Sequence, residues 1–87
     1  MYLVRVSSWA ICISPAPNQV IFSSDANSGR IFELDLAGTL IGSLGSFGKQ
    51  PGQFGWIHEI ACPSATEIYV GELLNWRMQK LLLKPGR

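Results

Sequence analysis

The sequence lacks several features by which common protein classes are identified. Only 15% of the 87 residues are charged, the formal net charge is +1, and the seven Lys and Arg residues are scattered along the chain. Nucleic-acid binding depends on clustered basic side chains that neutralise phosphates, so we expect no nucleic-acid partner. No apolar run approaches the roughly 18 to 20 residues of a membrane-spanning helix, so we expect no membrane partner either.

Targeting and catalytic signatures are also missing. The segment Met1–Arg5 has neither the basic region nor the long apolar region of a signal peptide, so we expect no targeting signal in this chain. A longer parent protein could still be secreted or periplasmic. No nucleophile elbow, phosphate-binding loop, Cys-x-x-Cys pair or catalytic triad is visible. The sequence therefore does not identify the cellular compartment of the protein.

The sequence is instead rich in apolar residues, which make up 47% of it. A domain of this length buries only about 60% of the surface that its unfolded chain exposes. We therefore expect part of the apolar surface to need a partner.

The most informative pattern is an internal repeat. Pro15 matches Pro63, and Gln19–Phe22 matches Glu67–Val70, each at an offset of 48. Arg30 then matches Arg77 at an offset of 47, which implies that one residue is lost in the turn between these strands. Repeats of about 40 to 50 residues are typical of four-stranded propeller blades. The repeat predicts an all-β fold, a β-propeller fragment of about two four-stranded antiparallel blades with the last one incomplete.

Turn residues divide the chain further. We expect a lead-in or edge strand at 1–8, a first blade at 9–47, an inter-blade loop at 48–56 and a second blade at 57–87. Within the first blade, alternation predicts that Phe32, Leu34 and Leu36 share one face and that Glu33 and Asp35 share the other. Gly38 is the expected site of a positive φ in the hairpin that follows.

Cys12 and Cys62 fall in the first strands of the two copies but one position out of phase, so alternation places their side chains on opposite faces of their sheets. A disulfide requires that these faces meet. We expect two small buried thiols instead.

The partners that the repeat implies are further blades or other copies of the chain. An incomplete last blade leaves an unpaired edge strand, and two blades leave two apolar faces. The chain is thus expected to be either a fragment of a longer propeller or a self-assembling piece, in which case three copies would close as a homotrimer with six blades.

One segment resembles a known family. The residues Gly52-Gln53-Phe54, His58, Ile68-Tyr69-Val70-Gly71-Glu72 and Asn75-Trp76-Arg77-Met78-Gln79-Lys80 resemble the NHL repeat. Among NHL-like six-bladed propellers, His58-Glu59-Ile60 is most similar to peptidyl-α-hydroxyglycine α-amidating lyase, whose corresponding histidines hold zinc in the central channel. The resemblance implies that His58 is a zinc ligand and that Glu59, in place of the usual Asp, acts as a general base or contacts the substrate hydroxyl.

Catalytic zinc takes three protein ligands, so the other histidines would have to come from other blades. The alternative for His58 is a channel-lining or hydrogen-bonded side chain with no metal. Zinc is thus a possible cofactor of an assembled protein and not of one chain alone.

Three further residues are candidates for a surface at the channel mouth that binds a protein or a small molecule. Trp56 and Trp76 could line it, although aromatic side chains between blades more often pack. Arg77 repeats as Arg30, which favours a loop or cross-strand hydrogen bond. Three functions stay open: a binding or scaffold module, part of a zinc-dependent amidating-lyase-like enzyme, and a self-assembling blade pair.

Overall fold

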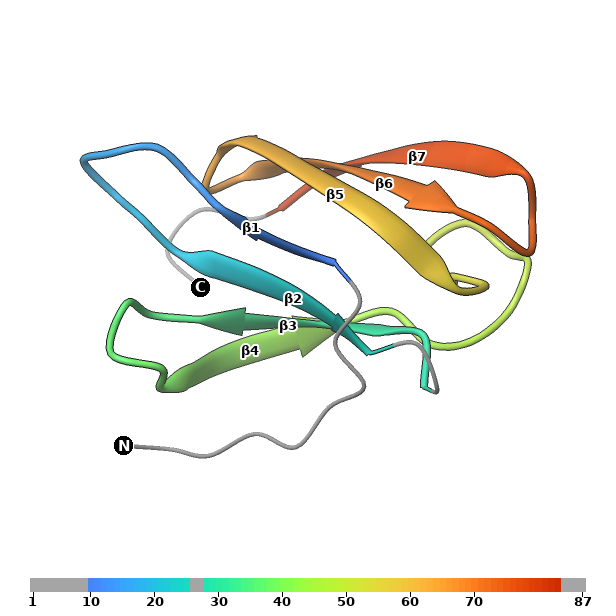
Figure 1. Cartoon of the computed structure of the whole chain (residues 1–87), viewed down its shortest axis with the longest axis horizontal. Helices are drawn as coiled ribbons and strands as arrows, with labels where there is room; N and C mark the ends of the chain where they lie inside the picture. The colour runs from blue at the N-terminus through green and yellow to red at the C-terminus, as the bar shows by residue number, and fades with distance from the viewer. Residues whose placement is uncertain (1–9, 26–27, 84–87) are drawn as a thin grey trace.

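The described part of the protein is all-β. The computed structural model describes residues 10–25 and 28–83, so the expected lead-in at 1–8 lies outside the described residues. These residues form no helix, and hence none that could cross a membrane. The strands, labelled in Figure 1, are β1 (Ile11–Ile13), β2 (Ile21–Asp25), β3 (Arg30–Leu34), β4 (Leu40–Leu44), β5 (Ile57–Ser64), β6 (Glu67–Glu72) and β7 (Arg77–Leu82).

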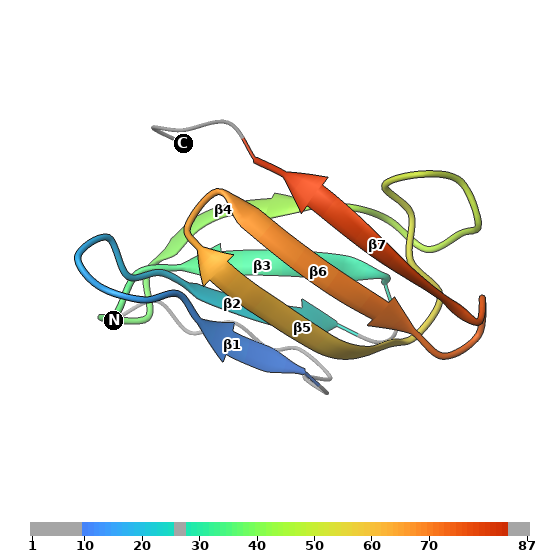
Figure 2. The same ribbon diagram turned by 90° about the horizontal axis from the view of Figure 1, so that it is seen from above.

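The strands form two antiparallel sheets, a first sheet in the order β1-β2-β3-β4 and a second in the order β5-β6-β7. The two sheets lie face to face as two layers, with β1 beside β5 (Figures 1 and 2). Residues 45–56 join β4 to β5 and are called the connecting loop. Between the sheets lies one apolar core. Both sheets and the connecting loop contribute to it the residues Phe22, Ile31, Phe54, Ile57, Ile68 and Val70, all 0% exposed. The expected fold class is confirmed, and the arrangement is consistent with about two blades of a β-propeller.

The hairpin registers correct the sequence alignment of the two copies. Asp25 pairs with Arg30 across the β2–β3 hairpin, and Glu72 pairs with Arg77 across the β6–β7 hairpin. The two turns therefore have equal length, and the offset is 47 on both strands. The predicted offset of 48 for the earlier strand, with one residue lost in the turn, is wrong, because hydrogen-bonded register and not residue similarity sets the correspondence.

This correspondence shows which faces meet in the core. At an offset of 47, Phe22 corresponds to Tyr69 and Ile31 to Met78. Phe22 and Ile31 are fully buried between the sheets, whereas Met78 is 68% exposed and Tyr69 partly exposed on the far side of the second sheet. The two sheets thus meet through faces that are not equivalent in the repeat. We call this head-to-tail packing.

The predicted alternation in β3 is present. The buried face, however, is that of Ile31 and Glu33 and not the apolar face of Phe32 and Leu34. Ile31 is 0% exposed and Glu33 only 5%, while Phe32 and Leu34 lie on the partly exposed face and Leu36 is 57% exposed beyond the strand. Glu33 lies opposite Phe22 in the register, on the face that packs against the second sheet. Charge failed to mark the exposed face because both faces of this sheet are largely apolar.

The cysteines form a disulfide between β1 and β5, with a Cα–Cα distance of 6.2 Å, so the expectation of two thiols is wrong. Cys12 lies opposite Phe22, and Ala61 lies opposite the corresponding Tyr69, so Cys62 is indeed one position out of phase. In head-to-tail packing, side chains on opposite faces are the ones that meet. The phase difference that seemed to disfavour the bond is what permits it.

Two glycines adopt conformations that their turns require. Gly38 has a φ of 89°, which confirms the positive φ expected in the β3–β4 hairpin. Gly29 has a φ of 67°, and a Cβ atom there would lie 2.6 Å from the Phe47 Cα and 2.7 Å from the Phe54 carbonyl oxygen. The connecting loop therefore packs against the β2–β3 turn so closely that no side chain fits.

Candidate functional site

The β6–β7 turn is organised around one buried carboxylate, that of Glu72 at the end of β6. Its side chain is 0% exposed. Oε1 accepts hydrogen bonds from the Gly55 N–H at 3.0 Å and from Asn75 Nδ2 at 2.7 Å. Oε2 accepts from Arg77 Nε at 2.7 Å and from Gln79 Nε2 at 2.8 Å. Two donors on each oxygen and one ion pair compensate for the burial of this charge.

These contacts keep Glu72 ionised. Burial by itself would raise the pKa of the Glu72 carboxyl, but the hydrogen bonds from Arg77, Asn75, Gln79 and the Gly55 N–H together outweigh it. The pKa is therefore held below its ordinary value. A carboxylate that is saturated in this way is a structural group and is not available as a base.

The partners of Glu72 hold the connecting loop in place. The guanidinium of Arg77 donates to the carbonyl oxygens of Lys49 at 2.6 Å, Gln50 at 3.1 Å and Gln53 at 2.9 Å. Gln79 Nε2 also donates to the Gln53 carbonyl at 2.8 Å. The loop hydrogen bonds predicted for Arg77 are thus present.

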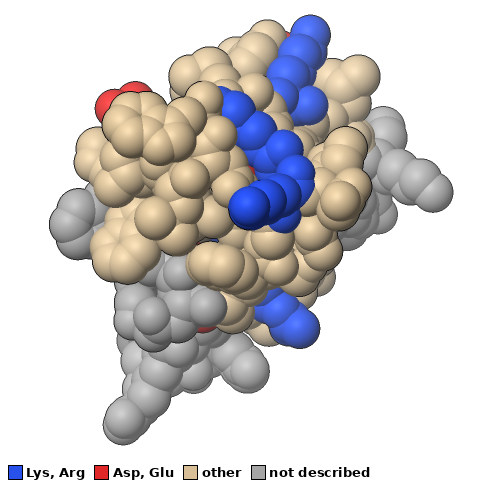
Figure 3. All heavy atoms as spheres, turned by 90° about the vertical axis from the view of Figure 1, so that its right-hand side faces the viewer, with Lys and Arg blue, Asp and Glu red and all other residues tan. Residues whose placement is uncertain are grey.

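The charge of this network is unevenly displayed. Figure 3 views the end of the molecule that carries the connecting loop and the β6–β7 turn; Lys and Arg atoms run across it, and little acidic surface is visible. Glu72 contributes none of that surface, whereas the Arg77 side chain is 29% exposed. The pair is neutral overall but presents only its cation to solvent.

His58 and Glu59 are placed by a β-bulge near the start of β5. Ile57 lies opposite Glu72, but Glu59 lies opposite Gly71, so His58 is an extra residue in the strand. β5 is an edge strand of its sheet, and the two side chains are 50% and 79% exposed, with His58 Nδ1 4.0 Å from Glu59 Oε1. Both of these predicted site residues are accessible.

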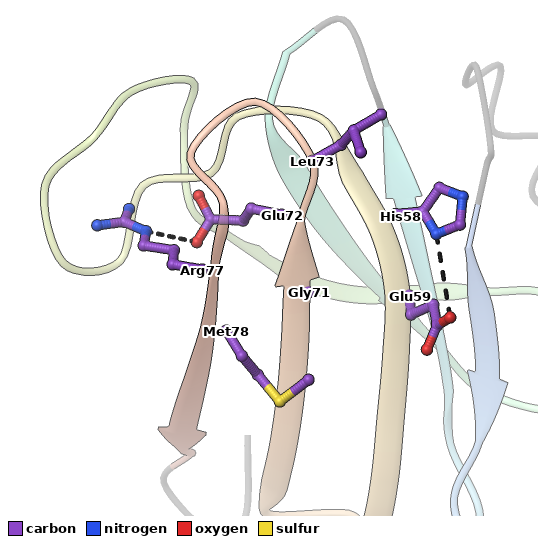
Figure 4. A pocket seen from close by; sticks show the side chains of 7 residues that line it. All are labelled: His58, Glu59, Gly71, Glu72, Leu73, Arg77 and Met78. Atoms are coloured by element: carbon purple, nitrogen blue, oxygen red, sulfur yellow. Dashed lines mark hydrogen bonds and ion pairs between the residues drawn. The ribbon is translucent and has the colours of Figure 1, made fainter.

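A hollow of about 280 Å³ adjoins these two side chains (Figure 4). Leu73 and Met78, which no sequence pattern marked as site residues, are 50% and 68% exposed and give the hollow apolar walls. The signal for Met78 was its match to the apolar Ile31 on an alternating strand. The residues that line the hollow are His58, Glu59, Gly71, Glu72, Leu73, Arg77 and Met78.

The two predicted tryptophans do not line this hollow. Trp56 is partly buried, and its carbonyl accepts a 2.9 Å hydrogen bond from the Leu73 N–H. Trp76 is 89% exposed with a φ of 52°, so the expectation that it packs is wrong for this chain. Of the residues predicted at the channel mouth, only Arg77 lines the hollow together with His58 and Glu59.

The residues predicted for zinc do not by themselves fit the ion. Within residues 10–25 and 28–83, no group of three or more His, Cys, Asp or Glu side chains could hold a metal. His58 and Glu59 provide two ligands at most, whereas catalytic zinc takes three from the protein.

Comparison with known protein families finds no family model that matches the sequence, and comparison with curated proteins finds no match.

Proposed function

We propose that the chain is a pair of NHL-type propeller blades that serves as a binding module and that the hollow beside His58 is its contact surface. The resemblance to the NHL repeat is supported by how its polar residues are used. Asn75, Arg77 and Gln79 all donate to Glu72 and also bind the loop that contains the Gly-x-Phe segment. A motif with this network has a structural reason for its spacing.

The observation that carries the binding function is the composition of the hollow. Leu73 and Met78 supply exposed apolar surface, and His58 and Glu59 supply accessible hydrogen-bonding groups. Glu72 and Arg77 satisfy each other and the loop, so they form a wall and not reactive groups. Apolar walls with a few orienting polar groups are typical of ligand sites. The ligand class that fits is a short peptide segment with an apolar side chain. Its backbone N–H groups can donate hydrogen bonds to the Glu59 carboxylate.

The test is a titration of the whole chain, followed by ¹H–¹⁵N NMR, with acetyl-Leu-Leu-amide and the matched acetyl-Gly-Gly-amide. We expect the leucine peptide to shift the amide signals of His58, Gly71 and Met78, and the glycine peptide to leave them unchanged. Glu59→Gln is expected to weaken the response, and Leu36→Gln, at an exposed position away from the hollow, is the control. Equal responses to the two peptides, or none at saturation, would refute the proposal.

One observation favours the lyase-like alternative as a second candidate. The extra residue in β5 is the single histidine, and Glu59 stands beside it, as the resemblance to the amidating lyase requires. Because the described residues do not complete a zinc site, this function requires ligands from other blades. Stoichiometric zinc in the purified protein, lost in His58→Ala, would support it, whereas a zinc content that is the same in both proteins would sink it.

A further inference from the structure

Each sheet has a second face, directed away from the core, that exposes large apolar side chains. The first outer face, on the first sheet, includes Ile11 and Ile13, which are 63% and 55% exposed; its members are Ile11, Ile13, Ile21, Phe32 and Leu34. The second outer face, on the second sheet, includes Met78 and Leu82, which are 68% and 74% exposed; its members are Glu59, Ala61, Glu67, Tyr69, Met78, Lys80 and Leu82.

The hairpin registers identify what these faces are. Ile21 and Leu34 pair with each other, as do the corresponding Ile68 and Leu81, which face the core from the second sheet. The first outer face is thus the equivalent of the core face of the second sheet. By the same offset of 47, the second outer face is the equivalent of the core face of the first sheet, because Tyr69 and Met78 correspond to Phe22 and Ile31.

The internal packing therefore shows how two such faces fit together. The core of one chain is a contact between a first-sheet core face and a second-sheet core face. The two outer faces are the same two kinds of surface, one of each kind on every chain. Of the three charged residues on the second outer face, Lys80 has a precedent, since the internal contact already holds the charged Glu33 at the corresponding position.

We infer that the second outer face of one copy packs against the first outer face of another copy and so repeats the internal head-to-tail packing between chains. The occupant is a second copy because the chain itself carries the matching surface. Such a contact is heterologous, so it leaves one face free at each end and either closes into a ring or continues as a chain of copies.

The size of the contact sets its strength. With strands about 4.8 Å apart and about 17 Å long, each face covers on the order of 300 Å², so one contact buries about 600 Å² in projection. Stable pairs usually bury about 1,200 Å² or more. A single contact therefore dissociates on dilution, and a closed ring is more persistent because each copy is held twice.

The second outer face overlaps the hollow at Met78 and Glu59, so a second copy would cover part of the surface proposed for the ligand. Ile13→Lys separates the two proposals, because Ile13 lies on the first sheet and does not line the hollow. This variant is expected to bind the leucine peptide as a monomer. A failure of peptide binding in Ile13→Lys would therefore refute the ligand proposal and leave the association unaffected.

The test uses one substitution on each outer face and sedimentation velocity on the whole chain. Ile13→Lys blocks the first outer face and Leu82→Lys blocks the second; both side chains are more than half exposed, so both variants are expected to fold with wild-type circular dichroism. Leu36→Lys, at a position in the β3–β4 turn that is 57% exposed and lies beyond the strands, is the matched control.

We expect the wild-type protein and Leu36→Lys to form species larger than one chain at sub-millimolar concentration. Each blocked variant alone is expected to be monomeric, and the two mixed are expected to form a dimer of one copy of each, because one intact pair of faces remains between them. The inference is overturned by a monomeric wild type, by blocked variants that still assemble alone, or by a mixture that stays monomeric.

Discussion

The β2–β3 hairpin and the β6–β7 hairpin are equivalent in the repeat but lie in different surroundings. Both are closed by an acidic and a basic residue in register, and both place a left-handed residue immediately before the basic one, Gly29 with a φ of 67° and Trp76 with a φ of 52°. The connecting loop presses against Gly29, where no Cβ fits. At the equivalent position, Trp76 is 89% exposed.

The difference shows that the surroundings, and not the backbone conformation, choose the side chain. A tryptophan in the left-handed region costs about 1–2 kcal/mol in either turn. At Gly29 it would also collide with the connecting loop, whereas at position 76 its side chain extends into solvent. The covered turn contacts the loop closely at Gly29, and the uncovered turn holds the same loop through Glu72 and Arg77. Because Leu73 of the uncovered turn also lines the hollow, the second copy carries both the structural network and the candidate contact surface.

The largest expected difference between the turns concerns their acidic residues. Glu72→Ala removes the acceptor of the buried Gly55 N–H and the ion-pair partner of Arg77, and should lower the free energy of unfolding by about 3 kcal/mol. Asp25→Ala removes an acceptor that binds the Ser28 hydroxyl at 2.6 Å in a partly buried position and should cost about 1 kcal/mol. Urea denaturation measures both. Equal losses would contradict the special role of the second turn.

The disulfide should contribute almost as much, because it ties the two copies together. Cys12 and Cys62 are 50 residues apart, and closing a loop of that length in the unfolded chain is worth about 4 kcal/mol in the chain-entropy model. The double variant Cys12→Ser, Cys62→Ser should lose about 2–4 kcal/mol in urea denaturation. Reductant should destabilise the wild type to the same level and leave the double variant unchanged. Insensitivity of both proteins to reductant would contradict this.

The left-handed residues should respond to substitution with opposite signs. Gly29→Ala places a methyl group against the Phe47 backbone in a strained conformation and should cost about 2 kcal/mol. Trp76→Asn introduces a residue that tolerates this conformation better and should raise the free energy of unfolding by about 0.5 kcal/mol. Thermal denaturation measures the melting temperature of both variants against the wild type. A loss of stability in Trp76→Asn would contradict this prediction and show that the indole packs in solution.

The smallest expected effect is a pH dependence of stability that Glu72 in the second turn produces. The pKa of Glu72 is lower in the folded protein than its ordinary value of 4.5, so the unfolded chain takes up the proton first as the pH falls. The stabilisation by Glu72 is therefore present above that value and lost as the pH falls through the lower, folded-state pKa. In urea denaturation as a function of pH, Glu72→Gln should show a flatter acid limb than the wild type. An equally steep acid limb in both proteins would contradict the lowered pKa of Glu72.

Much of this fold could be predicted from the sequence because alternation and turn residues are local signals. They located the strands near Arg30 and Arg77 and the positive φ of Gly38. The disulfide and the buried face of β3 could not be predicted, because both depend on which faces of two sheets meet, and residue similarity gave the wrong offset for one strand. For the candidate site, the family resemblance indicated His58 and the repeat indicated Arg77. Leu73 and Met78 could not be assigned to the hollow from sequence, because only the folded chain brings them next to the β-bulge at His58.

The head-to-tail packing of the two sheets is tested most directly by mapping the disulfide in protein folded in an oxidised and reduced glutathione buffer. Trypsin should release residues 6–30 and 50–77, which contain Cys12 and Cys62, and mass spectrometry without reduction should find these two peptides linked. The packing predicts the linked pair as the main product from monomeric protein. Free thiols on both peptides after folding, or a bond only between chains, would contradict it.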